Sequence, residues 1–172
     1  MQTIKLKYDS TKEHYDFLLK LRKQFSCVYR YSYNRLYDGL SKKEIYALVS
    51  NLNNVELIKG RLINDCIDFV SRMYEKDKEN NHRSIFGGKF NFRQRCKEKI
   101  TNEQFLQKRL IPLYLQGETA RNGNRNFDLD LLNNIITFKY DKQHHYNLII
   151  KPSTLNISQS CNSFINPKRV IS

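Results

Sequence analysis

The residues of this chain best suited to binding a ligand are the cations and aromatic rings between residues 83 and 109. This segment holds eight Lys or Arg residues and two Glu, with Phe90 and Phe92 between the cations and the pair Gly87-Gly88 before them. Lys and Arg displace the counterions of a phosphate backbone, rings offer stacking surfaces, and glycine lets the main chain approach closely. A second basic loop with a glycine follows at residues 120–125. The pattern predicts a nucleic-acid-binding surface.

Candidate contact residues come from four places in the chain. They are Lys20, Lys23, Arg30 and Asn34 in the first predicted helix, Asn64 in the third, Lys89, Arg93, Arg95 and Lys97 in the basic segment, and Arg121, Asn124 and Arg125 in the second glycine loop. Lys and Arg would meet phosphates, whereas Asn64 and Asn124 would contact bases or sugars. Phe90 and Phe92 are either stacking rings or core residues. The alternative for the helix cations is an ordinary solvated face.

Other chemistries find little support in the sequence. Asp128 and Asp130 lie two residues apart in a predicted strand, but metal catalysis requires carboxylates that converge from separate elements. The four cysteines are widely separated, without the paired spacing of a structural zinc site. The run Gly87-Gly88-Lys89 lacks the spacing of a Walker loop. We therefore expect no catalytic residues, no metal and no cofactor.

Composition points to a folded chain with polyanionic partners. The 172 residues carry 30 basic and 17 acidic side chains, a formal net charge of +13, and 40% of them are hydrophobic. Such a charge indicates a polyanionic binding partner, meaning nucleic acid or an anionic membrane surface. No apolar run approaches the ~20 residues of a membrane span, and the N-terminus shows no signal-peptide pattern. We expect a cytoplasmic protein without a membrane partner; association with the nucleoid is an alternative within this prediction.

Periodicity and capping patterns predict the elements that position these residues. A strand over residues 1–8 precedes a long helix opened by Ser10 and Glu13 and ended by Gly39. A short helix opened by Ser41, a third helix over residues 55–77, a short strand at 85–86 and two short helical pieces follow. Strands are expected at residues 113–115, 127–129, 135–140 and 146–150, the last two as a hairpin, and the tail from residue 152 is expected to be poorly ordered.

The order and spacing of several short segments resemble the N-terminal half of the TnpB family, the transposon-associated RNA-guided nucleases related to type V CRISPR effectors. The resemblance covers residues 1–151. It is carried by the basic first strand, the helix at 28–36 with Tyr33-Asn34, the helix at 67–76 with Tyr74, the segment Phe86-Gly87-Gly88-Lys89, and Gly123-Asn124-Arg125 before a hairpin.

The order of the predicted elements indicates an α+β fold. The resemblance implies that its strands form a small wedge-type, OB-like β-barrel, complete or incomplete, interrupted by an inserted helical lobe. Residues 1–9 and 110–151 would form the barrel portion, residues 10–109 the helical recognition lobe with the basic segment, and residues 152–172 the tail. These parts would bind guide RNA and, as a further ligand, target DNA with a short motif; Asn64 matches a motif-proximal amide of the family.

The catalytic RuvC domain of the family would follow where this sequence stops, and after Lys151 the sequence has no acidic residue. We therefore expect a binding module that does not cut DNA. It would be a partner of a separate RuvC-bearing chain, a repressor or a truncated remnant.

A protein-binding regulator that docks on a nuclease–RNA complex is the alternative function. We expect exposed tyrosines to suit a protein interface, namely Tyr29, Tyr31, Tyr33 and Tyr37. Salt separates the two functions, because phosphate contacts weaken steeply with salt and apolar protein contacts do not.

Overall fold

The computed structural model describes residues 8–9, 11–114, 126–130, 132–139 and 145–150. Its elements, in chain order, are β1 (Tyr8–Asp9), α1 (Lys12–Tyr37), α2 (Lys42–Ser50), α3 (Arg61–Glu79), α4 (Lys89–Cys96), α5 (Asn102–Lys108), β2 (Phe127–Asp130), β3 (Ile135–Lys139) and β4 (His145–Ile150). Among the described helices, none has the length and apolar composition needed to cross a membrane.

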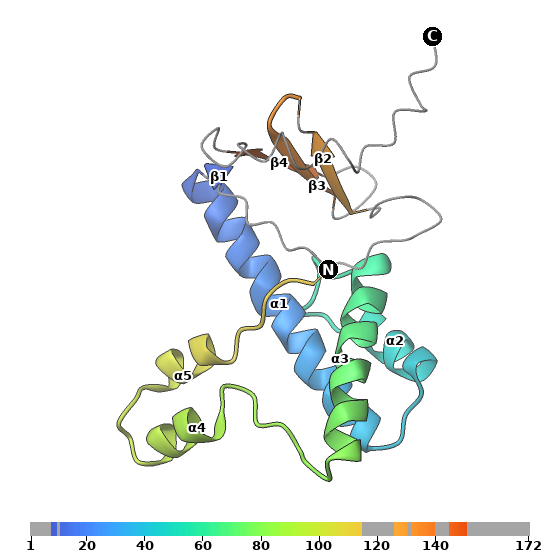
Figure 1. Ribbon diagram of the computed structural model, residues 1–172, viewed down its shortest axis with the longest axis vertical. Coiled ribbons are helices and arrows are strands. Elements are labelled where there is room, and N and C mark those ends of the chain that lie inside the picture. Colours follow the sequence, from blue (N-terminus) through green and yellow to red (C-terminus); the bar gives the residue numbers. More distant parts are fainter. Residues whose placement is uncertain (1–7, 10, 115–125, 131, 140–144, 151–172) are drawn as a thin grey trace.

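The long helix α1 lies at the centre of the helical part, with α2 and α3 on one side and α4 and α5 on the other (Figure 1). Thr11, one residue after the predicted Ser10, caps its start by accepting the N–H of His14 at 3.2 Å. The helix ends at Tyr37 with Asp38 as its C-cap, and Gly39 then takes a φ of +85°, which favours glycine and stops the helix as expected. Leu21, Phe25 and Val28 on its inner face are fully buried.

Helices α2 and α3 cover this inner face of α1. The predicted capping box at the start of α2 is confirmed, since Ser41 and Glu44 exchange hydrogen bonds. The third helix starts at Arg61 and not at residue 55, because the chain makes turns up to Gly60, whose φ is +51°. Gln24 of α1 holds this turn segment by accepting the N–H of Leu57 at 2.8 Å. The segment thus lies on α1 without belonging to a helix.

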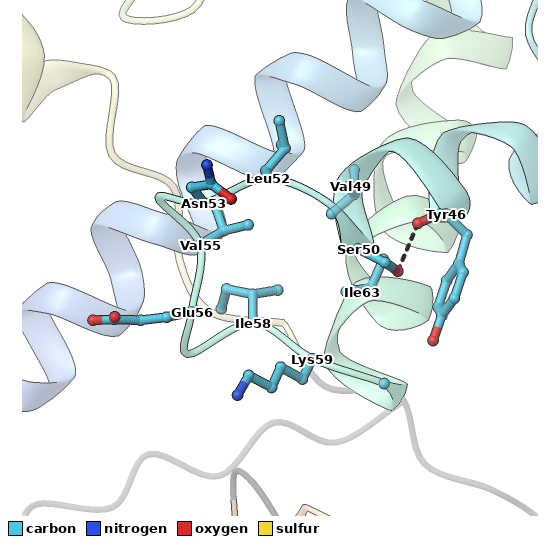
Figure 2. A pocket seen from close by; sticks show the side chains of 11 residues that line it. Tyr46, Val49, Ser50, Leu52, Asn53, Val55, Glu56, Ile58, Lys59 and Ile63 are labelled. Carbon is cyan, nitrogen blue, oxygen red and sulfur yellow. Dashed lines mark hydrogen bonds between the residues drawn. The ribbon is translucent and has the colours of Figure 1, made fainter.

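A hollow of about 450 Å³ lies between this turn segment and the helices (Figure 2). Buried Val49, Val55, Ile58 and Ile63 contribute much of its wall. Figure 2 shows the carboxylate of Glu56 and the ammonium of Lys59 directed away from its centre. The hollow is an extension of the apolar core and brings no group suited to chemistry together.

The predicted strand at Ile85–Phe86 is wrong. These residues form a turn, in which Gly88 donates its N–H to the carbonyl oxygen of Ile85 at 2.9 Å. The ring of Phe86 stands edge-on to the rings of Tyr29 and Tyr33, at centroid distances of 5.8 and 5.0 Å. Residues 113–114 are not a strand either. In both places the apolar side chains fasten an irregular segment to the helices.

The prediction of a β-barrel interrupted by a helical lobe was also wrong. The described chain is mainly helical, and its strands form one open antiparallel sheet in the order β1-β4-β3-β2. A barrel closes only when its outermost strands pair, whereas here β1 and β2 are the two edges. Within the described residues, β1 pairs with β4 through Tyr8 opposite Ile150 and Asp9 opposite Ile149. The domain boundaries drawn from the sequence stay predictions.

The sheet is joined to the helical body through β3. Phe138 of β3 is 6% exposed and belongs to the same buried cluster as the core residues of α1 and α3. β3 pairs with β2 on one side and β4 on the other, in the register Phe138 opposite Phe127 and Tyr146. The predicted hairpin of the last two strands is therefore present.

Candidate nucleic-acid interface

The two short helices α4 and α5 form a hairpin that projects from the side of α1 away from α2 (Figure 1). Gly88, with φ at +82°, lets the chain turn into α4, and Thr101 with Gln104 caps α5 by the predicted capping box. Phe105 of α5 is buried, whereas α4 has no buried residue. Arg95 joins the helices by donating to Asn102 at 2.9 Å. The hairpin is thus held by α5 and exposes α4.

One face of α4 carries cations with exposed side chains. Lys89, Arg93 and Lys97 are spaced by four residues and therefore lie on one stripe of the helix. None of the three forms an ion pair or side-chain hydrogen bond with another described residue. Beside them the ring of Phe90 is 71% exposed. With this exposure Phe90 is not a core residue, so of the two predicted roles the stacking role is the one that its position allows.

The N-terminal end of the hairpin is fixed to the core by a buried hydroxyl. Tyr33 donates its hydroxyl proton to Asp77 of α3 at 2.6 Å and accepts the backbone N–H of Ser84 at 2.7 Å. Burial, followed by the bond to Asp77, raises the pKa of Tyr33 well above its ordinary value. Burial opposes the charge of Asp77, but hydrogen bonds from Ser84 and Tyr33 outweigh it and hold the pKa of Asp77 below its ordinary value.

The C-terminal end is fixed by three side chains on successive turns of α1. Arg22 donates Nε–H to the carbonyl oxygen of Ile111 at 2.9 Å, the Ser26 hydroxyl accepts the N–H of Ile111 at 3.0 Å, and Arg30 donates to the carbonyl oxygen of Arg109 at 3.4 Å. Burial and the nearby charge of Arg109 lower the pKa of Arg30. Arg30, predicted to meet phosphate, is half-buried and holds the hairpin in place.

The structure separates the other predicted residues. Lys20 is paired with Glu56 across an exposed contact, and Lys23 is exposed near it on α1. Asn34 lies beside the hairpin, where its side-chain oxygen accepts a hydrogen bond from Arg83 at 3.2 Å. Asn64 lies elsewhere, in a groove between α2 and α3 that Lys42 and Lys43 also line. Arg121, Asn124 and Arg125 lie outside the described residues. Four of the predicted residues, Lys89, Arg93, Arg95 and Lys97, share the hairpin.

Arg83 and Arg109 are the cations that the sequence did not single out. Both line a cleft of about 540 Å³ between the hairpin and α1, together with Asn34 and the rings of Phe86, Phe92 and Phe105. Their positions at the two ends of the basic segment were visible in the sequence, but nothing in the spacing showed that those ends meet. The tyrosines proposed for a protein interface are mostly inside the molecule: Tyr29 and Tyr33 are buried, and Tyr31 and Tyr37 are half-buried.

The acidic side chains do not converge. Asp130 accepts the N–H groups of Leu132 and Asn133, each at 3.0 Å, and the side-chain bond from Asn133 leads the effects that lower its pKa. Asp128 faces Lys139 at 3.8 Å. Within the described ranges, no group of three His, Cys, Asp or Glu side chains is placed to hold a metal ion.

Comparison with known proteins assigns a family to the sequence. The model of the SSO2105 N-terminal domain family matches residues 1–151, most of the chain. The chain belongs to that family. No curated protein and no solved structure matches it. All described residues, including the α4–α5 hairpin and its cleft, lie within the SSO2105 N-terminal domain match.

Proposed function

We propose that this chain is a nucleic-acid-binding module that uses the α4–α5 hairpin to bind single-stranded or looped RNA. The observation that carries the proposal is the exposed stripe of Lys89, Arg93 and Lys97 with the ring of Phe90 beside it, on a helix with no buried residue. A helix that packs no side chain into the core makes few stabilising contacts inside the molecule. Its residues are therefore not needed for packing and are free to contact a ligand. Cations that follow a backbone and rings that stack on bases are the means by which proteins hold single strands.

The resemblance to TnpB proteins extends this proposal to a guide-type RNA, with motif-bearing target DNA as a second ligand and a RuvC-bearing chain as a partner. The absence of a barrel among the described strands removes the wedge from the proposal, so it rests on the hairpin. The groove of Asn64, Lys42 and Lys43 on the other side of the helices is the place for the second ligand. The proposal assigns the chain binding and no chemistry.

A salt titration with matched charge variants tests the hairpin. The triple variant Lys89→Gln, Arg93→Gln, Lys97→Gln removes three positive charges from α4. The control, Lys12→Gln, Lys59→Gln, Lys76→Gln, removes three exposed charges elsewhere. Each phosphate contact contributes about 0.7 to the slope of log affinity against log salt for single strands. Losing three contacts should therefore flatten the slope by about 2 for the hairpin variant and leave the control near wild type.

RNA copurified with the tagged chain at moderate salt identifies the ligand. One dominant structured RNA, lost in the hairpin triple variant and kept in the control, is the expected result. Equal loss of RNA in both variants would mean that the overall positive charge, and not the hairpin, binds the RNA. That result would overturn the proposal. A stoichiometric protein that stays bound at high salt, without RNA, would establish the regulator instead. Two of the four tyrosines on which that regulator was based, Tyr29 and Tyr33, are buried, which weakens the case for it.

A further inference from the structure

The cleft between the hairpin and α1 combines three rings with four polar residues, one of which is Ser84. Phe92 of α4 is 45% exposed and tilted against Phe105 at a centroid distance of 6.2 Å, so part of its ring remains open to a ligand. Asn34, Arg83 and Arg109 stand around the rings, and no acidic residue lines the cleft. Its volume of about 540 Å³ lies within the ordinary range of small-ligand sites.

The polar groups of the cleft are hydrogen-bond donors. The side-chain oxygen of Asn34 is occupied by Arg83, which leaves its amide N–H groups for a ligand. The guanidinium of Arg83 lies over the Tyr37 ring at 4.8 Å, and that of Arg109 lies over the Phe105 ring at 5.6 Å. Guanidinium groups donate hydrogen bonds and do not accept them, so Arg83, Arg109 and the amide of Asn34 together favour a ligand rich in acceptors.

A second feature is the positive charge crowded behind the cleft. Arg30 donates to the carbonyl oxygen of Arg109, and their two guanidinium groups repel each other, which together with burial lowers the pKa of Arg30. Gly87, at φ +89°, lets the loop approach so closely that a Cβ atom there would lie 3.0 Å from Cγ of Arg109. The base of the Arg109 side chain therefore packs against the loop at Gly87, and its guanidinium lies over Phe105.

We propose that this cleft binds one unpaired guanine nucleotide of the RNA, with the base against Phe92 and its acceptor edge toward Arg109 and Asn34. Guanine presents two adjacent acceptors, O6 and N7, to which arginine donates in pairs, whereas adenine places a donor amino group beside N7. Arg83, at the mouth with its guanidinium on Tyr37, takes the phosphate. This inference rests on the proposed function and adds the base that the site selects.

Two RNA probes test the base preference by fluorescence anisotropy. One is a twelve-nucleotide oligoadenylate, and the other has a single guanosine at its centre. We expect wild type to bind the guanosine probe about tenfold more tightly, within the range for one bidentate base contact. Arg109→Lys keeps the charge but loses the paired donors, so the ratio should fall to about one while the oligoadenylate affinity stays within about twofold.

Two further variants guard against a folding defect at Arg109. Asn34→Asp, at an exposed position of α1, replaces an amide donor with a carboxylate that pairs with Arg83 and repels O6. It should abolish the guanosine preference as well. Phe92→Leu keeps an apolar contact to Phe105 but removes the stacking plane, and should weaken the guanosine probe more than oligoadenylate. The hairpin triple variant should weaken both probes equally and leave the ratio unchanged.

Guanosine 5′-monophosphate separates failure of this inference from failure of the proposed function. Saturation-transfer NMR should show contact between the protein and the H8 proton of this nucleotide, with adenosine 5′-monophosphate much weaker. Oligonucleotide binding with equal affinity for both probes would overturn the guanine site and leave the proposed function standing. Binding of the mononucleotide without any oligonucleotide binding would overturn the proposed function and leave the guanine site standing. A guanosine preference that survives in both Arg109→Lys and Asn34→Asp would place the base elsewhere and overturn the assignment to this cleft.

Discussion

Replacing Tyr33 with phenylalanine removes one hydroxyl from the contact between α1, α3 and the loop that leads into the hairpin. The ring itself is 1% exposed and would keep its packing against Phe86 and Tyr37. Each tyrosine has one hydroxyl proton. That of Tyr33 goes to Asp77, and that of Tyr37 goes to the carbonyl oxygen of His82 at 2.7 Å. The 3.4 Å contact between the two hydroxyls therefore adds little.

The loss of stability in Tyr33→Phe follows from the two other hydrogen bonds of the Tyr33 hydroxyl, both of which phenylalanine cannot make. The bond to the Asp77 carboxylate is charge-assisted and contributes about 1.5–3 kcal/mol. The half-buried N–H of Ser84 loses its acceptor, which costs about 1 kcal/mol more. We expect Tyr33→Phe to lower the free energy of unfolding by about 2.5–4 kcal/mol, a large part of the 5–15 kcal/mol typical of a domain.

Urea denaturation of the full chain, followed by circular dichroism at 222 nm, measures this loss. Tyr37→Phe is the matched control, because its hydroxyl makes one bond at the surface, and it should cost less than about 1 kcal/mol. A double-mutant cycle with Asp77→Asn should give a coupling of about 2 kcal/mol, and the Ser84 amide should lose protection from hydrogen exchange. A loss below about 1 kcal/mol in Tyr33→Phe, or one equal to that of Tyr37→Phe, would refute the reasoning.

Three further outcomes are expected. Gly87→Ala should destabilise the chain by about 1–2 kcal/mol and weaken RNA binding, since φ is +89° and the new Cβ would meet Arg109 and Phe105; a chemical-denaturation curve and an anisotropy titration check it. The pKa of Asp77 is lowered by folding, so its contribution is present above its ordinary value near 3.8 and is lost as pH falls further; Asp77→Asn should therefore lose less stability than wild type between pH 4 and about 2 in urea melts. Burial raises the pKa of Tyr29 from 10.0 to about 12, so wild type should lose about 2–3 kcal/mol of stability from pH 10 to 12 that Tyr29→Phe does not lose; an unchanged alkaline difference would contradict this.

Local patterns in the sequence were enough to place most helix ends. The capping boxes at Ser41 and Thr101 and the stop at Gly39 depend on residues three or four apart, so they could be predicted from neighbours alone. The late start of α3 could not, because the turn before Arg61 is held by Gln24, which is remote in sequence. The barrel came from the resemblance and from element order, and neither shows which strands pair at the edges.

The candidate site was predicted in part for the same reason. The cations of α4 follow each other closely, so their common surface was visible in the sequence. Spacing alone did not show that Arg30 would bond the carbonyl oxygen of Arg109, nor that Arg83 would reach Asn34. Whether a cation of this chain bonds inside the molecule or stays free at the surface depends on which acceptor groups the fold brings close to it. Those acceptors come from distant segments of the sequence.

Both ends of the hairpin are held by α1, at Tyr33 and at Arg22, Ser26 and Arg30. The residues between Ser84 and Arg109 therefore form a loop that is anchored at both ends and, between them, by buried Phe105 of α5. Substitution, insertion or exchange within α4 leaves the hydrogen bonds of Ser84 and Ile111 in place. Because α4 has no buried residue, its side chains can change without removing any member of the buried core.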